Sequence, residues 1–257
     1  MKNIKFGWIR DLPDKRDFMY GFSLSKRSTL DTAVNLVSGM PYVYDQGRLG
    51  SCTAQAMAAV YQFTLKENKN VTYTPSRLKI YYDERTIEGT VKYDSGATLR
   101  SGMKVLAKYG VCPETLWTYN DRTGMNAKFK KKPSKKCYNV SKKHKALKYY
   151  RVAQREHDLC SSLTLNDPIV FGFAVFESFY SNDVTVNGNV PMPNYNRESM
   201  LGGHAVCLVG YNLTTRKFLV RNSWGKNWGL GGYFTMPFDY VLDPHLSADF
   251  WALKIVK

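Results

Sequence analysis

Residues 44–61 read YDQGRLGSCTAQAMAAVY and join a polar, glycine-rich loop to an apolar segment. From Ala54 to Tyr61, apolar residues recur at the i, i+3, i+4 and i+7 spacing of one helical face, and the other faces are apolar too, which predicts a mostly buried helix. Ser51 is the expected N-cap, so Cys52 falls in the first turn. A thiol there meets unpaired N–H groups and the positive end of the helix dipole, which favour the thiolate. We therefore predict a reactive Cys52.

Three further residues supply what an activated cysteine needs. Gln46 carries a side-chain N–H that could reach an oxyanion beside the helix start. His204 stands at the entrance of an alternating apolar run, GGHAVCLVGY, at residues 202–211. Asn222 follows a short apolar strand in FLVRNSWGKNWGLGGYF, residues 218–234. A base, a group that orients it and an oxyanion donor are the partners of a covalent nucleophile.

These blocks resemble the three catalytic blocks of the papain-like cysteine peptidases (peptidase family C1). The blocks are QGRLGSC, GHAV and NSWGKNWGLGGY, in that family's order. His204 lies 152 residues after Cys52, close to the roughly 130–150 residues expected for such enzymes. The resemblance extends through DSGATLRSGMKVLAKYGVCPE and covers most of residues 40–257. The DQGRLGSCTA form is most similar to the branch found in bacteria, archaea and large DNA viruses.

The resemblance implies an α+β fold with two lobes, one helical and one an antiparallel β-barrel-like lobe, with the active-site cleft between them. It implies that Cys52 is the nucleophile, His204 the acid and base, and Asn222 the residue that orients His204. Gln46 and the Cys52 backbone N–H would stabilise the oxyanion.

Substrate-binding positions also follow from the resemblance. They are Gly96, Gly172, Ala205, Ala248 and Trp224, and Trp224 would in addition shield the His204–Asn222 hydrogen bond from water. Because Gly172, Ala205 and Ala248 are small, we expect a roomy apolar pocket for a bulky aliphatic or aromatic side chain.

The chain is long enough for one compact catalytic unit. We expect a helical lobe at residues 41–135 and a β-rich lobe at 136–257, preceded by a leader at residues 1–40. The leader contains GWIRDLPDKRDFMY and mixes turn signals with balanced charge. We interpret it as a structural arm on the surface. The alternative is a pro-segment that covers the cleft and inhibits the enzyme.

Periodicity predicts the remaining elements. The expected helices are Ser76–Thr86, Thr98–Tyr109 and Arg155–Leu165. The expected strands are Pro168–Phe176, Ala205–Tyr211, Phe218–Arg221, Tyr233–Met236 and Trp251–Val256. We expect a hairpin and loop at Val184–Pro193.

The charge is strongly basic, at +16, and ten lysines lie between Lys128 and Lys148. A basic patch can bind phosphate backbones, but such runs are more often solvated surface, and the aromatic residues here do not form a stacking platform. We do not expect nucleic-acid binding.

Five scattered cysteines show no metal-ligand spacing, so we expect no metal and no cofactor. No signal-peptide core and no apolar run of about 20 residues is present. We therefore expect an intracellular protein without a membrane segment, located in a virion or the host cytoplasm if the source is viral.

The predicted function is hydrolysis of peptide bonds in a polypeptide substrate by a monomeric enzyme, through a Cys52 thioester. Two alternatives stay open. An amidase or transpeptidase would use the same three residues, and a papain-fold binding protein would have no catalysis. Intact Cys52, His204, Asn222 and Gln46 argue against the second alternative.

Overall fold

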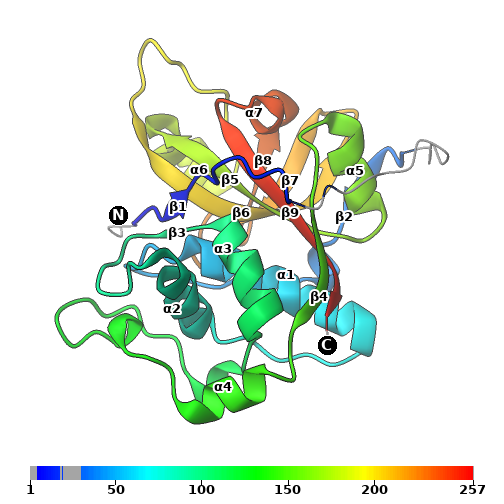
Figure 1. Cartoon of the computed structure of the whole chain (residues 1–257). Helices are drawn as coiled ribbons and strands as arrows, with labels where there is room; N and C mark the ends of the chain where they lie inside the picture. The colour runs from blue at the N-terminus through cyan, green and yellow to red at the C-terminus, as the bar shows by residue number, and fades with distance from the viewer. Residues whose placement is uncertain (1–4, 18, 20–29, 257) are drawn as a thin grey trace.

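The structure is a computed structural model that describes residues 5–17, 19 and 30–256. Helices gather on one side of the molecule and a large sheet on the other (Figure 1). The helical side contains α1 (Cys52–Lys69), α2 (Arg77–Glu88), α3 (Leu99–Lys104) and α4 (Lys135–Ser141). The two-lobed α+β architecture expected from the sequence is confirmed.

The sheet has seven strands and runs in the order β4-β9-β5-β6-β7-β8, with β2 paired to β6, and every pairing is antiparallel. The path does not close into a barrel. The strands are β2 (Ala33–Asn35), β4 (Ala146–Arg151), β5 (Ile169–Phe176), β6 (Met200–Asn212), β7 (Lys217–Arg221), β8 (Tyr233–Pro237) and β9 (Ser247–Val256).

Strand alternation divides the sheet into two apolar faces. Val170, Cys207 and Leu253 point into a core shared with α1, whereas Phe171 and Leu208 point into a second core on the opposite face. Successive side chains of a strand alternate between faces, so each buried strand serves both cores. Helices α5 (Glu156–Thr164), α6 (Asn182–Asn187) and α7 (Phe238–Leu242) belong to the sheet side (Figure 1).

Helix α1 is buried on all sides from Cys52 to Leu65, as its composition predicts. Ser51 occupies the N-cap position, but its hydroxyl makes no capping hydrogen bond. It bonds instead to the Tyr119 hydroxyl at 2.7 Å and to the Gln55 amide at 3.2 Å. The predicted side-chain cap is therefore wrong, because buried polar partners hold this hydroxyl away from the helix N–H groups.

The helices expected at Ser76–Thr86 and Thr98–Tyr109 are present with nearly those bounds. The Ser76 hydroxyl accepts from the Lys79 N–H and starts α2. A π-helical turn, Val105–Tyr109, extends α3 and ends at Gly110 with φ 69°, a conformation that favours glycine. The hairpin predicted at Val184–Pro193 is wrong, because its first residues belong to α6. Ser181 caps that helix and Gly188 ends it, and these local signals outweigh the β-branched composition between them.

The leader forms a short strand, β1 (Trp8–Ile9), that pairs in parallel with β3 (Ala97–Thr98). In Figure 1, β1 lies between the helices and the sheet. A hollow of about 580 Å³ surrounds this part of the chain, lined by residues 5–9 and by residues of both lobes, among them Ser95 and Gly203. The described residues contain no helix with the length and apolar character to cross a membrane.

Candidate active site

Two lobes contribute the predicted catalytic residues. Cys52 opens α1 and is fully buried, while His204 lies on β6 and Asn222 directly follows β7. His204 Nε2 is 2.8 Å from Asn222 Oδ1, and the Ser223 backbone N–H donates to the same oxygen at 2.8 Å. Because an amide oxygen only accepts, Nε2 must carry the proton. The second ring nitrogen of neutral His204, Nδ1, is then an acceptor.

His204 Nδ1 has no hydrogen-bond partner among the described residues. Backbone groups of Ala205, Gly7 and Thr53 lie close enough to the Cys52 sulfur to favour the thiolate and lower the pKa of the thiol. A free acceptor on the ring and a thiol in the same cleft are the two groups that a proton transfer from sulfur to imidazole requires.

Burial sets the protonation of both groups in this covered arrangement. It raises the pKa of the Cys52 thiol to about 12, although the Ala205 and Gly7 backbone groups oppose the effect. It lowers the pKa of His204 to about 4, against a smaller opposing effect from Asn222. In the covered cleft, burial therefore favours the neutral thiol and the neutral imidazole, against the helix position of Cys52, which favours the thiolate. Admitting water to the cleft would remove the dominant cause of both shifts.

Gln46 is held in place by Ser223, which the sequence analysis did not predict as a site residue. The Ser223 hydroxyl donates to Gln46 Oε1 at 2.8 Å. The Gln46 Nε2 group therefore points away from Ser223. Nε2 then donates to the Leu49 carbonyl at 2.9 Å and to the Lys5 carbonyl of the leader at 3.0 Å. The donor predicted for an oxyanion thus holds a peptide oxygen. Ser223 stands inside the NSWG block, so its position was the available signal.

The leader passes directly over Cys52. The Gly7 carbonyl accepts from the Ala97 N–H at 2.8 Å. A Cβ added to Gly7 would lie 1.8 Å from the Gly50 carbonyl oxygen, and one added to Gly96 would lie 2.2 Å from the Gly7 oxygen. Glycine is required on both sides of this approach, so Gly96 lies against the leader, and its role in binding substrate stays a prediction.

A large aromatic side chain fills the predicted small-residue pocket. Gly172 is in register with Ala205 on β6 and with Ala248 on β9, so the three predicted residues are neighbours. A Cβ on Gly172 would lie only 2.0 Å from the Trp8 ring. The pocket therefore accommodates an indole because these strands carry little or no side chain there.

Trp224 covers the His204–Asn222 pair. Its ring centroid is 4.9 Å from that of His204, with the planes 31° apart. Phe6 of the leader completes the apolar surroundings, with its ring 6.2 Å from His204 and 6.4 Å from Trp224. All nine predicted site residues thus lie on elements that border leader residues 5–8.

Two acidic residues near the site were not predicted. Glu84 is fully buried, and Thr53, the residue after the nucleophile, donates to it at 2.8 Å. Burial raises the pKa of Glu84 well above its usual range. Asp249 accepts from Trp8 Nε1 at 3.1 Å. No motif marks either residue, and the one available signal for Asp249 is its position next to Ala248.

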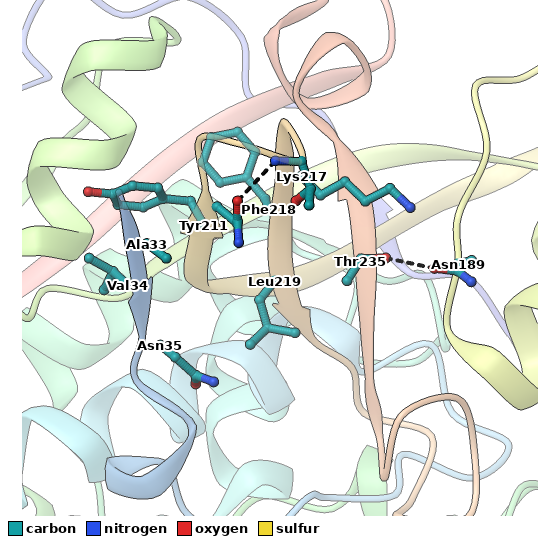
Figure 2. Close-up of a pocket in the computed structure, with 11 residues that line it drawn as sticks. Ala33, Val34, Asn35, Asn189, Tyr211, Lys217, Phe218, Leu219 and Thr235 are labelled. Carbon is teal, nitrogen blue, oxygen red and sulfur yellow. Dashed lines mark hydrogen bonds between the residues drawn. The ribbon is translucent and has the colours of Figure 1, made fainter. Parts of the chain in front are cut away.

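A second hollow lies away from this site on the sheet. It has a volume of about 400 Å³ and is bordered by β2, β6, β7 and β8 (Figure 2). Its walls include Asn35, Tyr211, Lys217 and Thr235, and none of the nine predicted site residues lines it. The predicted catalytic residues therefore belong to the cleft between the lobes and not to this hollow.

Comparison with known proteins agrees with this geometry. The family model described as "Papain family cysteine protease" matches residues 28–241. The chain belongs to the papain family of cysteine proteases. This papain-family protein is 41% identical to an uncharacterized peptidase C1-like protein of Acanthamoeba polyphaga mimivirus, over 98% of this chain and 87% of the viral protein.

Solved structures of cysteine proteases are also similar to this papain-family protein. Xylellain, a cysteine protease from Xylella fastidiosa, is 44% identical with a TM-score of 0.93, over 100% of this chain and 98% of xylellain. The proenzyme of cathepsin B from Trypanosoma congolense has a TM-score of 0.76 at 19% identity, a likeness that shows the fold alone. The predicted similarity to bacterial and viral members is confirmed, and the protein is by class a hydrolase.

Proposed function

We propose that this protein hydrolyses peptide bonds through a Cys52 thioester, with His204 as acid and base. The observation that carries the proposal is the His204 ring, whose Nε2 is bound by Asn222 while Nδ1 has no hydrogen-bond partner among the described residues. In an uncovered cleft, Nδ1 would take the Cys52 proton, and the thiolate would attack a peptide carbonyl.

The remaining steps use groups already positioned. Gln46 Nε2 and the Cys52 N–H would stabilise the oxyanion, since Gln46 already binds the Lys5 carbonyl in the cleft. The imidazolium would give its proton to the leaving amine and break the C–N bond. His204 would then activate water to release the acid from the thioester. Asn222 would keep the ring in one tautomer and orientation throughout.

We infer further that the leader inhibits the enzyme by occupying this cleft. Lys5 binds Gln46, Gly7 covers Cys52 and Phe6 packs on His204 and Trp224, so a substrate cannot reach the nucleophile at the same time. Departure of the leader would be the activating step.

The alternatives concern later steps or the absence of chemistry. An amidase or transpeptidase would form the same thioester and differ in substrate or acceptor. A binding protein would retain the cleft without reacting. The intact hydrogen-bond chain from Gln46 through Ser223 to Asn222 and His204 favours a reactive site.

The test is the intact mass of the protein after incubation with an epoxide or vinyl-sulfone cysteine-protease inhibitor. We expect slow formation of one adduct on the full chain, faster formation after removal of residues 1–29, and none on Cys52→Ala. This deletion retains β2, which begins at Ala33. Equal rates for the two forms would contradict inhibition by the leader. No adduct on either form would favour the binding-protein alternative.

A further inference from the structure

The leader is also anchored outside the cleft, by the carboxylate of Asp11. Three donors from the rest of the chain (residues 41–256, called the body below) bind this carboxylate. Asp11 is buried, and its Oδ2 accepts from Arg151 Nη1 and from Trp251 Nε1, each at 3.1 Å. Its Oδ1 accepts from the backbone N–H of Arg100 at 3.0 Å. Every donor lies in the body, so the binding site for this carboxylate does not depend on the leader's own structure.

A second leader carboxylate lies beside the first. Arg100 holds Asp17 with a two-pronged contact, Nε at 3.0 Å and Nη2 at 2.7 Å, and Arg151 Nη1 adds a third contact at 3.2 Å. Arg100 Nη1 donates to the Leu12 carbonyl at 2.6 Å. In the part of the chain that the structure describes, every hydrogen bond of the Arg100 guanidinium therefore goes to the leader.

Asp249 connects this cluster to the Trp8 pocket. Its Oδ2 accepts from the Trp8 indole and from the Asp11 N–H at 2.8 Å, while its Oδ1 accepts from Arg151 Nη2 at 2.9 Å. Asp249 has φ 62°, an uncommon value for a residue other than glycine. The strand is irregular at this point, because its register with β5 shifts between Val170 and Gly172.

The leader reverses the net charge of this cluster. The body contributes Arg100, Arg151 and Asp249, a net charge of +1, and the leader adds the two negative charges of Asp11 and Asp17. Without the leader, the buried Trp251 N–H and most donors of the two guanidiniums lose their acceptors. A carboxylate that replaced those of the leader would again make charge-assisted hydrogen bonds to the guanidinium forks and to the Trp251 N–H, so the site favours this group.

We propose that Arg100, Arg151 and Trp251 form a carboxylate-binding subsite that selects polypeptide substrates with acidic side chains. The inference rests on the proposed function, since the subsite is vacant only when the leader departs. Its place follows from the leader, where Asp11 lies three residues from the indole in the small-residue pocket and four from the residue over Cys52. Four residues of extended chain span at most about 14 Å. Substrates with a bulky aromatic residue and an acid a few residues away fit both positions.

The experiment uses the full chain with Gly7→Ala, Asp11→Ala and Asp17→Ala, which displaces the leader and removes its carboxylates. Acetylated and amidated peptides carry one Asp, scanned over the third to sixth positions on either side of the scissile bond, against matched Asn peptides. We expect a preference for Asp of about tenfold in kcat/KM at one or two adjacent positions, falling as salt is raised.

Variants of the body identify the donors. Adding Arg151→Gln or Arg100→Gln should reduce the Asp preference to within about twofold while turnover of the Asn peptides persists. Arg100→Lys, which retains the charge without the fork, should keep part of it. Arg216→Gln removes a surface arginine paired with Glu156 and should leave the preference unchanged. Circular dichroism checks that each variant is folded. If a glutamine variant is unfolded, the Asp preference of the Arg100→Lys variant decides whether the guanidinium contributes to the subsite.

Failure of the subsite can be distinguished from failure of the peptidase. Turnover with equal rates for Asp and Asn peptides at every position would overturn the subsite alone. If no peptide is cleaved, binding of the same peptides to the displaced-leader chain carrying Cys52→Ala is measured by calorimetry. Tighter binding of the Asp peptide, lost on Arg151→Gln, would support the subsite without catalysis, and equal binding would overturn it.

Discussion

Replacing Gly7 by alanine should open the cleft in the full-length protein. The added methyl group would lie 1.8 Å from the Gly50 carbonyl oxygen and 2.4 Å from its carbon, distances that backbone atoms cannot tolerate. The contact cannot be relieved by turning a side chain, because both crowded atoms belong to the main chain of the loop before α1. We therefore expect the leader strand to move away from Cys52.

The expected magnitude follows from the cost of overpacking. Forcing an extra methyl group into a close-packed site costs typically about 1–3 kcal/mol. If the covered and open forms exchange quickly, this cost raises the open fraction by roughly 5- to 150-fold, at about 1.4 kcal/mol per factor of ten. The rate of covalent labelling at Cys52 by an epoxide inhibitor should rise by the same factor, since only the open form reacts.

Gly210→Ala provides a matched control. Its methyl group would lie 2.3 Å from the Val34 carbonyl oxygen, a backbone clash of the same kind at the pairing of β2 with β6. It should lower the melting temperature without accelerating the labelling of Cys52. The reasoning is refuted if Gly7→Ala labels at the wild-type rate, or if Gly210→Ala accelerates labelling as much.

The catalytic geometry and the leader contacts lead to four further expectations. Gln46→Ala in the displaced-leader protein should lower kcat by about 10²–10³-fold if its N–H binds the oxyanion, whereas a purely structural role would lower the melting temperature with little change in kcat. Asn222→Ala should lower kcat roughly 10- to 100-fold because His204 loses the acceptor that sets its tautomer, and the melting temperature should fall as well because the His204 Nε2–H and the Ser223 N–H lose a buried acceptor. Normal peptide turnover would exclude an orienting role. Trp8→Ala should accelerate labelling of the full chain by about 10- to 150-fold, the equivalent of exposing one large apolar side chain, and an unchanged rate would mean that the indole does not hold the leader. Burial lowers the pKa of His204 from 6.5 to about 4, so the unfolded chain binds more protons than the folded protein between these pH values. The contribution of His204 to stability should therefore fall by up to about 3 kcal/mol as the pH drops through that window. Urea unfolding at pH 7 and 4.5 should show this loss in wild type and not in His204→Gln, and equal losses would contradict it.

The candidate catalytic residues stand out in the sequence because each lies in a short contiguous block whose local structure is decided by its own residues. Cys52 follows a glycine-rich loop and opens a helix, and Asn222 follows a strand and precedes a loop of glycine and tryptophan. These features do not depend on distant contacts. The neighbourhood of Gly172, Ala205 and Ala248 followed from the family resemblance, and strand register supplies its physical basis.

The position of the leader could not be predicted in the same way. Its charges are balanced, which is also typical of a solvated arm, and their partners are remote in the chain. Asp11 meets Arg151 across 140 residues and Trp251 across 240. No periodicity reports such pairs. The effect of burial on the pKa of Cys52 could not be predicted for a related reason, because the helix dipole is a local effect whereas burial depends on what covers the site.

Two local expectations from the sequence are overridden by tertiary structure. Ser51 fits the composition of a cap, but the hydroxyl of Tyr119, 68 residues away, engages it. Asp249 lies in a stretch whose composition is that of a regular strand, but the register with β5 is irregular there. Its side chain reaches the cleft through a backbone conformation with positive φ, which composition does not reveal.

The pairing of β2 with β6 has a consequence for activation. Ala33–Asn35 attaches the leader chain to the body sheet, so the front of the leader is tethered a short length of chain from its own binding site. Two binding partners joined within one chain meet at an effective concentration of roughly 1 mM. If the severed front bound with a dissociation constant of about 1 μM, the tethered form would be open only about one time in a thousand. One cut between residues 19 and 30 would then change inhibition from a property of the single molecule into one that depends on dilution.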